Sequence, residues 1–321
     1  MIEMLTEAEF AAQERQRGFA LHQHDGVWWR RVFPFYCKPV VEFRPFAPGA
    51  AKPSLVKSFA GYSHQVPGPA FANRSLDCML LQGEDLRNFS LSRLDSKKRN
   101  QVRKGFKNCR IEPIADLKCH EEDLFQINVT QSLRQMASGS FYKPVTHYTE
   151  RRAAWWAGMT GQFGWKGRVW WGAFLEDRLI GYILTEAVES VLFVCAAKTH
   201  PDFFSYCPSD ALHFTVLEQA SRSGMVERVV HGGGDENASL KRYKEQFLFH
   251  LQSVPWFTAR EPVYRLCARA FAAREALRTR LQLFTVKARG QDEAARSVCK
   301  TAASELTPRK DSSSGDAQRG A

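Results

Sequence analysis

The stretch RVWWGAFLEDRLIGYILTEAVESVLFVCAAKTHPDFFSYCPSDALHFTVLEQASRSGMVERVVHGGGDENASLKRYKEQFLF, residues 168–249, decides the fold. Its first part predicts a β-hairpin, because aromatic and β-branched residues flank a short polar turn at residues 176–178. A third strand is expected at residues 191–197. A helix is expected at residues 211–223, ending at Gly224, which is a good helix terminator.

The second half of the stretch combines a strand, a glycine run and a short helix. Residues 226–231, VERVVH, predict a buried strand that leads into three consecutive glycines. A helix is expected from Ala238, because Leu240, Tyr243 and Phe247 are spaced as one apolar stripe. A meander of strands followed by a helical crossover predicts an α/β fold with a mixed sheet and helices packed against it.

Two segments resemble the Fem-type (FemAB-like) branch of the GNAT acyltransferase superfamily. The basic segment LSRLDSKKRNQVRK, residues 91–104, is similar to the helix before the first core strand of that branch. The other segment begins with HGGG at residues 231–234 and ends with LKRYK at residues 240–244. It is similar to the closing element of the branch, a glycine followed by Leu-x-x-Phe-Lys. The resemblance implies a GNAT-like, mostly antiparallel mixed sheet flanked by helices, with an N-terminal subdomain.

The chain departs from the acetyl-CoA users of the superfamily in one loop. Those proteins carry Gln/Arg-x-x-Gly-x-Gly/Ala between strand and helix, whereas residues 201–210 here read PDFFSYCPSD. The resemblance implies acetyl-CoA or another acyl-CoA as the cofactor. The missing loop leaves aminoacyl transfer from charged tRNA as the alternative.

The resemblance also places the acyl donor where the third hairpin strand and the next strand splay apart. Backbone N–H groups there would hold carbonyls of the donor, and the N-terminus of the following helix would meet its phosphates. Asp210 in the first turn of that helix opposes a phosphate, whereas His200 favours one. The expected donor-binding residues are Val194, Cys195, Ala196, Lys198 and Ser209.

Three side chains near the splayed strands are candidates for proton handling. His231 has an unperturbed pKa that suits a base at neutral pH, and Asp235 follows the glycines where it would orient the incoming amine. Tyr243 lies near the position where many GNAT enzymes place an aromatic general acid. Each also has a structural explanation. His231 ends a strand, Asp235 suits a turn or a helix N-cap, and Tyr243 suits the apolar core. Glu186 or a chain of waters is the alternative base.

Other residues around these candidates are expected to bind the acceptor. The glycines let a backbone approach a ligand closely, and two lysines three residues apart form a face for a carboxylate or phosphate. A loop between two expected helices adds an aromatic and an imidazole side chain to the edge of the pocket. The expected substrate-binding residues are Gly233, Gly234, Glu236, Lys241, Lys244, Tyr142 and His147.

Composition restricts the class of protein. The 321 residues are 44% hydrophobic, which suits one large core or two modest ones. The sequence contains no run of about 18 apolar residues, so no transmembrane helix is expected. The N-terminal residues 1–7 lack the pattern of a signal peptide. Eight scattered cysteines without a Cys-x-x-Cys pair suggest reduced thiols in a cytoplasmic protein, and we expect no metal site.

The net charge of +11 is concentrated in one segment. Residues 84–110 contain nine Lys or Arg and three acids. The apolar pattern predicts a helix with Leu94, Val102 and Phe106 facing inward. Such a helix attracts tRNA or another polyanion, although the same pattern fits a solvated surface. The cations expected to point outward are Lys97, Lys98, Arg99, Arg103 and Lys104.

These features divide the chain into four parts. Residues 1–83 form an N-terminal subdomain or an incomplete GNAT-like half, and residues 84–260 form the acyltransferase domain. Residues 261–286 predict an amphipathic helix, and residues 287–321 are polar enough for a disordered tail. We expect a cytoplasmic N-acyltransferase that uses an acyl-CoA and acts on an amine of a sugar, peptide or small metabolite. The alternatives are a Fem-type aminoacyl transferase and a non-catalytic polyanion-binding module.

Overall fold

The structure is a computed structural model that describes residues 2–33, 35–47, 49–137, 143–233, 237–263, 265–266, 269–270 and 273. Of Phe33 and Gly233 only the backbone is described. The contacts form one compact unit, Met1–Cys267, and a second unit, Ala268–Ala321, of which three helical residues are described. Most of the expected helix at 261–286 and all of the expected tail at 287–321 lie outside the described residues.

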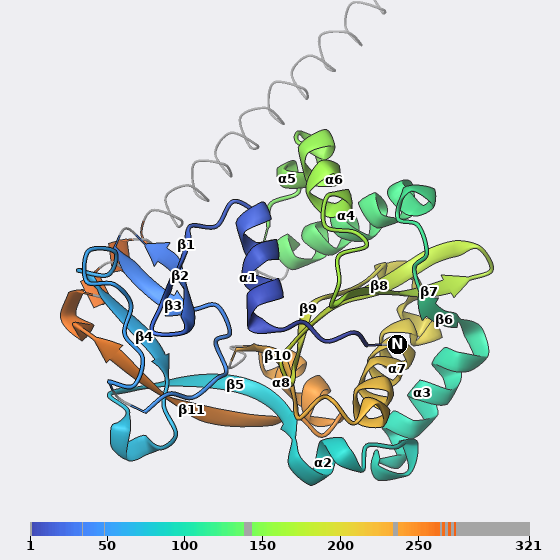
Figure 1. The fold of residues 1–321 in the computed structure, drawn as a ribbon. Helices are drawn as coiled ribbons and strands as arrows, with labels where there is room; N and C mark the ends of the chain where they lie inside the picture. The colour runs from blue at the N-terminus through green and yellow to red at the C-terminus, as the bar shows by residue number, and fades with distance from the viewer. Residues whose placement is uncertain are drawn as a thin grey trace, which may run out of the picture. The chain divides into compact units, whose positions relative to one another are not determined.

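One sheet of eleven strands organises the first unit (Figure 1). Its order is β1-β2-β3-β4-β11-β5-β10-β9-β8-β7-β6, and all neighbours are antiparallel except the pairs β3–β4 and β9–β10. The expectation of a mixed, mostly antiparallel sheet is therefore confirmed. The strands are β1 (Leu21–His24), β2 (Val27–Phe33), β3 (Tyr36–Pro39), β4 (Gly61–Gln65), β5 (Arg74–Gln82), β6 (Arg110–Pro113), β7 (Arg168–Leu175), β8 (Arg178–Val188), β9 (Val191–Thr199), β10 (Arg228–Gly233) and β11 (His250–Ala259).

Helices pack against both faces of this sheet. The α-helices are α1 (Glu7–Gln16), α2 (Gly83–Arg87), α3 (Ser96–Asn108), α4 (Glu121–Ala137), α5 (Thr146–Thr149), α6 (Arg152–Thr160), α7 (Pro208–Ser223) and α8 (Ala238–Glu245). Short 3₁₀ helices are η1 (Pro69–Phe71), η2 (Leu91–Arg93), η3 (Lys118–His120) and η4 (Pro201–Tyr206). No described helix is long and apolar enough to cross a membrane.

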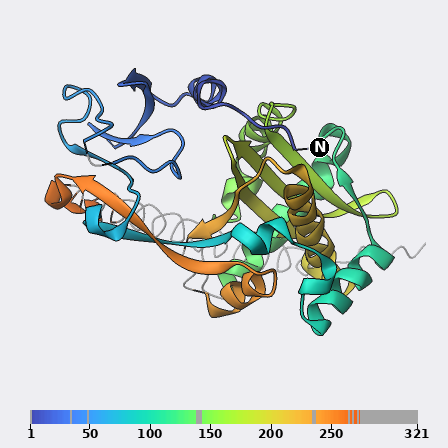
Figure 2. The ribbon, with the colours of Figure 1, turned by 60° about the horizontal axis from the view of Figure 1, so that its bottom comes forward.

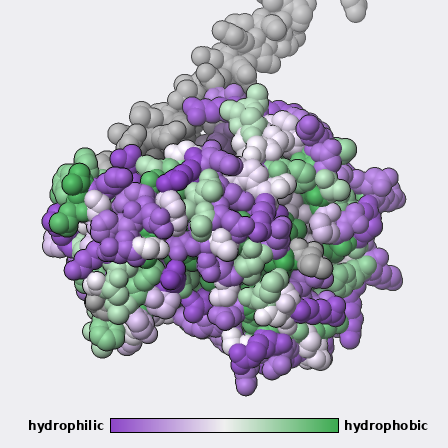
Figure 3. Space-filling model, in the orientation of Figure 1, coloured by the Kyte–Doolittle hydropathy of each residue, from purple (hydrophilic) through white to green (hydrophobic). Residues whose placement is uncertain are grey.

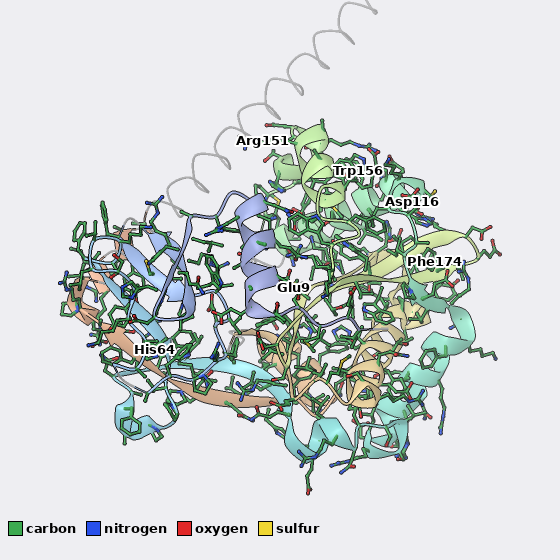
Figure 4. All side chains as sticks on the ribbon, in the orientation of Figure 1. Glu9, His64, Asp116, Arg151, Trp156 and Phe174 are labelled. Carbon is green, nitrogen blue, oxygen red and sulfur yellow. The ribbon has the colours of Figure 1, made fainter. Side chains whose placement is uncertain are left out.

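Adjacent tryptophans on β7 show how the two faces are divided. Trp171 packs in the core formed with α3 and α7, whereas Trp170 packs in a second core under α4, α5 and α6. Successive strand residues point to opposite faces, so these two helical layers lie on opposite sides of the sheet. Figure 4 shows Trp156 on the second layer and Phe174 on the sheet.

The central hairpin and the long helix form where the sequence predicts them. β7 and β8 are joined through Glu176 and Asp177, and Glu176 takes the left-handed conformation that such a tight turn requires, with φ 54°. α7 ends at Ser223, and Gly224 caps it with φ 66°.

Helix α3 forms as expected but presents two residues differently. Asp95 is its N-cap and accepts a hydrogen bond from the Lys98 N–H at 2.8 Å. The expectation that Lys98 points outward is wrong, because its side chain is 1% exposed and meets a buried carboxylate. Phe106, expected inside, is 44% exposed and only touches the edge of Phe214.

The N-terminal strands extend the same sheet. β4 pairs with β11, and β11 runs beside β5 over seven residue pairs, as Figure 2 shows for the long central strands. β5 therefore lies between β10 and β11, although it precedes the expected boundary after residue 83. That boundary stays a prediction.

Candidate active site

Strands β9 and β10 separate within the sheet. They pair through three positions, the last joining Val230 to Phe193, and both strands then continue without pairing to each other. The register with β8 skips Cys195, so β9 carries a bulge there. Cys195 and Ala197 are exposed although the strand is central in the sheet. The unpaired ends of β9 and β10 therefore form an opening in the sheet, which we call the β9–β10 opening.

A hydrogen-bonded row of three rings, one buried and two half-buried, lies behind the end of β10. Nε2 of His231 is 3.0 Å from Nε2 of His213, and the hydroxyl of Tyr243 is 3.2 Å from Nδ1 of His213. The same Nδ1 is 2.8 Å from the carbonyl oxygen of Ser209. Because a carbonyl only accepts, Nδ1 of His213 carries the proton, and its Nε2 accepts from His231. This assignment leaves Nδ1 of His231 without a proton.

Burial keeps this row uncharged. It lowers the pKa of His213 to about 4, and it lowers the pKa of His231 well below the usual histidine range. The positive charge of Lys244 adds to both effects. Burial also raises the pKa of Tyr243 well above its usual value. His231 is therefore a neutral imidazole at physiological pH and a weak base.

An ion pair connects the helices behind the opening. Nζ of Lys98 on α3 lies 2.6 Å from Oδ1 of Asp210 on α7. The same ammonium is 4.3 Å from the ring centroid of Tyr243 and 4.9 Å from that of Phe247. Gly105 permits the close approach of the two helices, because a Cβ there would lie 2.6 Å from the carbonyl oxygen of Cys207.

The first turn of α7 does not fit the pyrophosphate of coenzyme A. Pro208 has no N–H, and the N–H groups of Asp210 and Ala211 donate to the carbonyl of Cys207. Ser209 is also engaged, since its hydroxyl lies 2.6 Å from that of Thr199. The carboxylate of Asp210 places a negative charge in the same turn. Two of the N–H groups that a phosphate site needs are therefore engaged at this helix end, and a third is absent at Pro208.

The two lysines expected to grip an anion from α8 differ in their surroundings. Nζ of Lys244 is buried and donates to the carbonyl of His231 at 2.7 Å, which holds the end of β10. Lys241 is exposed and lies 3.8 Å from Glu245. The carboxylate of Glu186, the alternative base, forms a buried ion pair with Arg168 on the opposite face of the sheet.

A second polar cluster lies at the far end of β9, under α4 and α5. Nζ of Lys198 is 2.5 Å from Oδ1 of Asn128 and 3.1 Å from the hydroxyl of Tyr148. Both partners are neutral, and within the described part of the chain no carboxylate forms an ion pair with Lys198. Burial, and then the charge of Lys143, lower the pKa of Lys198 to about 8. His147 adjoins Tyr148, with ring centroids 5.1 Å apart.

This cluster is cationic. The pKa of His147 is lowered, first by burial and then by the charges of Lys143, Arg151 and Lys198. Figure 4 shows Arg151 on the same helical layer. We call Lys143, Arg151 and Lys198, with the mostly neutral ring of His147 beside them, the cationic corner. It lies on the other side of the sheet from α7, so Lys198 does not face the first turn of that helix.

The structure thus brings some expected site residues together and leaves others apart. His231 and Tyr243 join through His213, a residue that the sequence analysis did not single out. Four expected residues lie outside the described part of the chain: Tyr142, Gly234, Asp235 and Glu236. Among the described residues no three His, Cys, Asp or Glu side chains form a group that would hold a metal ion.

Several solved structures share this fold. The crystal structure of FemX aligns with a TM-score of 0.52 at 10% sequence identity, over 80% of this chain and 92% of that chain. A conserved protein of unknown function from Bacteroides thetaiotaomicron aligns with a TM-score of 0.50 at 12% identity, over 78% and 90% of the two chains. The C-terminal domain of a putative lysylphosphatidylglycerol synthetase from Agrobacterium fabrum gives 0.48 at 9% identity, over 81% and 89%. No protein-family model and no curated protein matches the sequence.

The fold is a GNAT-like fold of the Fem type, as the resemblance implied. Identities near 10% show this fold alone.

Proposed function

We propose that the chain is an N-acyltransferase whose reaction takes place at the β9–β10 opening. The observation that carries this proposal is the separation of two central strands after Phe193 and Val230, next to the bulge at Cys195. Strand ends that lack a partner offer backbone N–H groups to a carbonyl oxygen, and such donors stabilise the oxyanion of acyl transfer. The reactive ester or thioester would lie against Val194 and Ala196.

In this reaction an amine attacks the carbonyl carbon of the acyl donor. The new C–N bond forms, the C–O or C–S bond to the leaving group breaks, and one proton leaves the nitrogen. His231 lies on β10 beside the opening, and with the proton on Nε2 its Nδ1 keeps a lone pair. It is a weak base, but a nitrogen that has attacked a carbonyl is a stronger acid than the free ammonium, so a neutral imidazole suffices.

Between the possible donors, the structure favours an aminoacyl ester of tRNA over an acyl-CoA. In the first turn of α7, Pro208 has no N–H, two further N–H groups donate to the carbonyl of Cys207, and Asp210 adds a carboxylate. Helix α3 keeps four exposed cations, Lys97, Arg103, Lys104 and Lys107, which suit a polyanion. The cationic corner would hold a negatively charged group of the donor or of the acceptor.

The test measures donor binding at the opening. Thermal unfolding and equilibrium binding are recorded with coenzyme A, acetyl-CoA, a long-chain acyl-CoA, uncharged tRNA and aminoacyl-tRNA. We expect stabilisation by aminoacyl-tRNA. The variant Ala197→Phe, which fills the opening from an exposed position on β9, should abolish the part of the affinity that depends on the aminoacyl group. The matched control is Ala154→Phe at an exposed position on α6.

The outcomes separate the donors. If an acyl-CoA stabilises the wild-type chain and the Ala197→Phe variant loses this stabilisation, the donor is an acyl-CoA. The N-acyltransferase proposal would be contradicted if no donor binds or stabilises the wild-type chain at millimolar concentration.

A further inference from the structure

Two neighbouring turns of the N-terminal part expose large apolar side chains. Leu55 and Val56 are 78% and 81% exposed, Phe59 is 52% exposed, and Phe35 is 41% exposed. Figure 3 shows hydrophobic residues gathered at the left edge of the face in view, where β11 ends and the loop before β4 lies. Side chains that are four-fifths exposed project from the surface and touch little of the protein. We call Phe35, Leu55, Val56 and Phe59 the apolar tip.

Hydrogen bonds and a ring contact hold these turns in place. The rings of Phe35 and Phe59 pack at an angle of 36° with centroids 4.1 Å apart, and the N–H of Ala60 donates to the carbonyl of Phe35 at 3.0 Å. The N–H of Lys57 and the hydroxyl of Ser58 both donate to the carbonyl of Ser54, at 3.0 and 2.9 Å. The apolar tip is therefore presented by a defined turn.

The exposed charges beside the apolar tip are positive. Residues 43–76 contain four Lys or Arg and no Asp or Glu, although Arg44 pairs with Glu7. Of the three cations at residues 26–41, Arg30 and Lys38 pair with Glu42. Arg31, Lys52 and Lys57 are exposed beside the apolar tip. Projecting apolar side chains among cations match the two layers of a membrane surface, the apolar acyl boundary and the anionic headgroups.

We propose that the apolar tip and its flanking cations dock this protein on an anionic lipid surface. Leu55, Val56 and Phe59 insert at the level of the headgroups, and Lys52 and Lys57 contact lipid phosphates. The observation does not depend on the reaction at the β9–β10 opening. If both proposals hold, the reaction at the β9–β10 opening takes place close to a membrane.

The experiment measures binding of the full chain to lipid vesicles. Sedimentation compares vesicles of phosphatidylcholine alone with vesicles that contain phosphatidylglycerol, at low and high salt. We expect binding to the anionic vesicles that weakens with salt. The double variant Lys52→Glu and Lys57→Glu should bind at least tenfold more weakly, since each cation near the surface contributes roughly fivefold.

A second variant tests the apolar part of the surface. Leu55→Ser with Val56→Ser should also lower vesicle affinity at least tenfold, in high salt as well as in low salt. Its matched control is Leu133→Ser on α4, which is 50% exposed and should bind like the wild-type chain. Each variant should unfold at the wild-type temperature, because the changed side chains are exposed.

Three results would overturn the proposal. The first is a wild-type chain that does not sediment with anionic vesicles. The second is an equal loss of binding in the Leu133→Ser control. The third is a wild-type chain that is a dimer by light scattering, together with a Leu55→Ser and Val56→Ser variant that is a monomer. A second copy of the chain would then cover the apolar tip.

Discussion

His231 is the residue at which the hydrogen-bonded row of His231, His213 and Tyr243 reaches the β9–β10 opening. A general base contributes about a hundredfold to ten-thousandfold. His231→Gln should therefore lower kcat at least a hundredfold while donor binding stays within twofold, because glutamine keeps an N–H that can donate to His213. The measurement is steady-state kinetics with the donor identified by the binding test.

The control for this prediction is His250→Gln, a change at an exposed histidine that lies 3.0 Å from Asp85 on the outside of the sheet. It should leave kcat unchanged. Near-wild-type turnover in His231→Gln, with an unshifted pH profile, would show that the proton leaves by another route.

Lys198 gives a prediction about pH. Its pKa in the folded chain is about 8, below the value of 10.5 for a free lysine, so the unfolded chain binds more protons between these values. The free energy of unfolding should rise with pH over this window, by on the order of 3 kcal/mol for the full shift. Lys198→Met should lack this rise, as measured by urea unfolding from pH 7 to pH 10.5.

The comparison variant is Lys241→Met, because Lys241 is exposed on α8 and pairs only weakly with Glu245 at 3.8 Å. Its stability should follow the wild-type pH dependence. If Lys198→Met follows it too, Lys198 titrates in the folded chain like a solvated lysine, and burial does not lower its pKa.

Individual site residues could be predicted from the sequence only where they lie close together along the chain. His231 stands out beside three glycines, but His213 lies in an apolar helix and becomes significant only when α7 packs against β10. Lys98 was misjudged for the same reason. Its partner Asp210 is distant in sequence, and nothing in a run of cations marks the one that meets a buried carboxylate.

At the scale of elements, the pair Lys98–Asp210 joins α3 to α7. Removing one member of a buried ion pair leaves an uncompensated charge and typically costs about 3 to 5 kcal/mol. Lys98→Met should therefore lower the free energy of unfolding by about that amount. Adding Asp210→Leu should restore most of the loss, because a pair of apolar residues replaces the ion pair.

Urea unfolding of the two single variants and the double variant measures this coupling. Lys107→Met, at an exposed position of α3, should change stability by no more than about 0.5 kcal/mol. If Lys98→Met is as mild as this control, the ion pair does not hold the two helices together.

Elements with strong local signals were predictable from the sequence. The β7–β8 hairpin has a polar turn between aromatic strands, and α3 and α7 have an N-cap and a terminal glycine respectively. Residues 39–69 are rich in Pro, Gly, Ala and Ser, and yet this region contains β4. The five residues of β4 owe their conformation to pairing with β11, about 190 residues later, which no local pattern reports.

At the scale of the whole molecule, the outer face of α3 is the surface expected to meet a polyanion. A depression of 440 Å³ there is lined by Ser96, Lys97, Asn100, Gln101 and Lys104. Lys97→Glu with Lys104→Glu should weaken tRNA binding at least tenfold at low salt and lower the dependence of affinity on salt, since fewer counterions are released. Filter binding across a salt series measures both.

The matched control is Arg222→Glu with Lys118→Glu, two exposed cations on other elements. These changes alter the net charge equally. Equal weakening in both double variants would mean that tRNA responds to the overall charge of +11 and that α3 carries no particular site.

The place of β5 in the sheet has a consequence for biosynthesis. β5 ends at Gln82, but its two neighbours begin at Arg228 and His250. A ribosome therefore releases this apolar strand long before either partner exists, and both of its edges stay open to pairing with other chains. Because the sheet depends on such distant pairs, we expect slow folding that completes only after β11 has emerged. A nascent chain stalled before residue 228 should keep a chaperone bound, and one extended past residue 260 should release it.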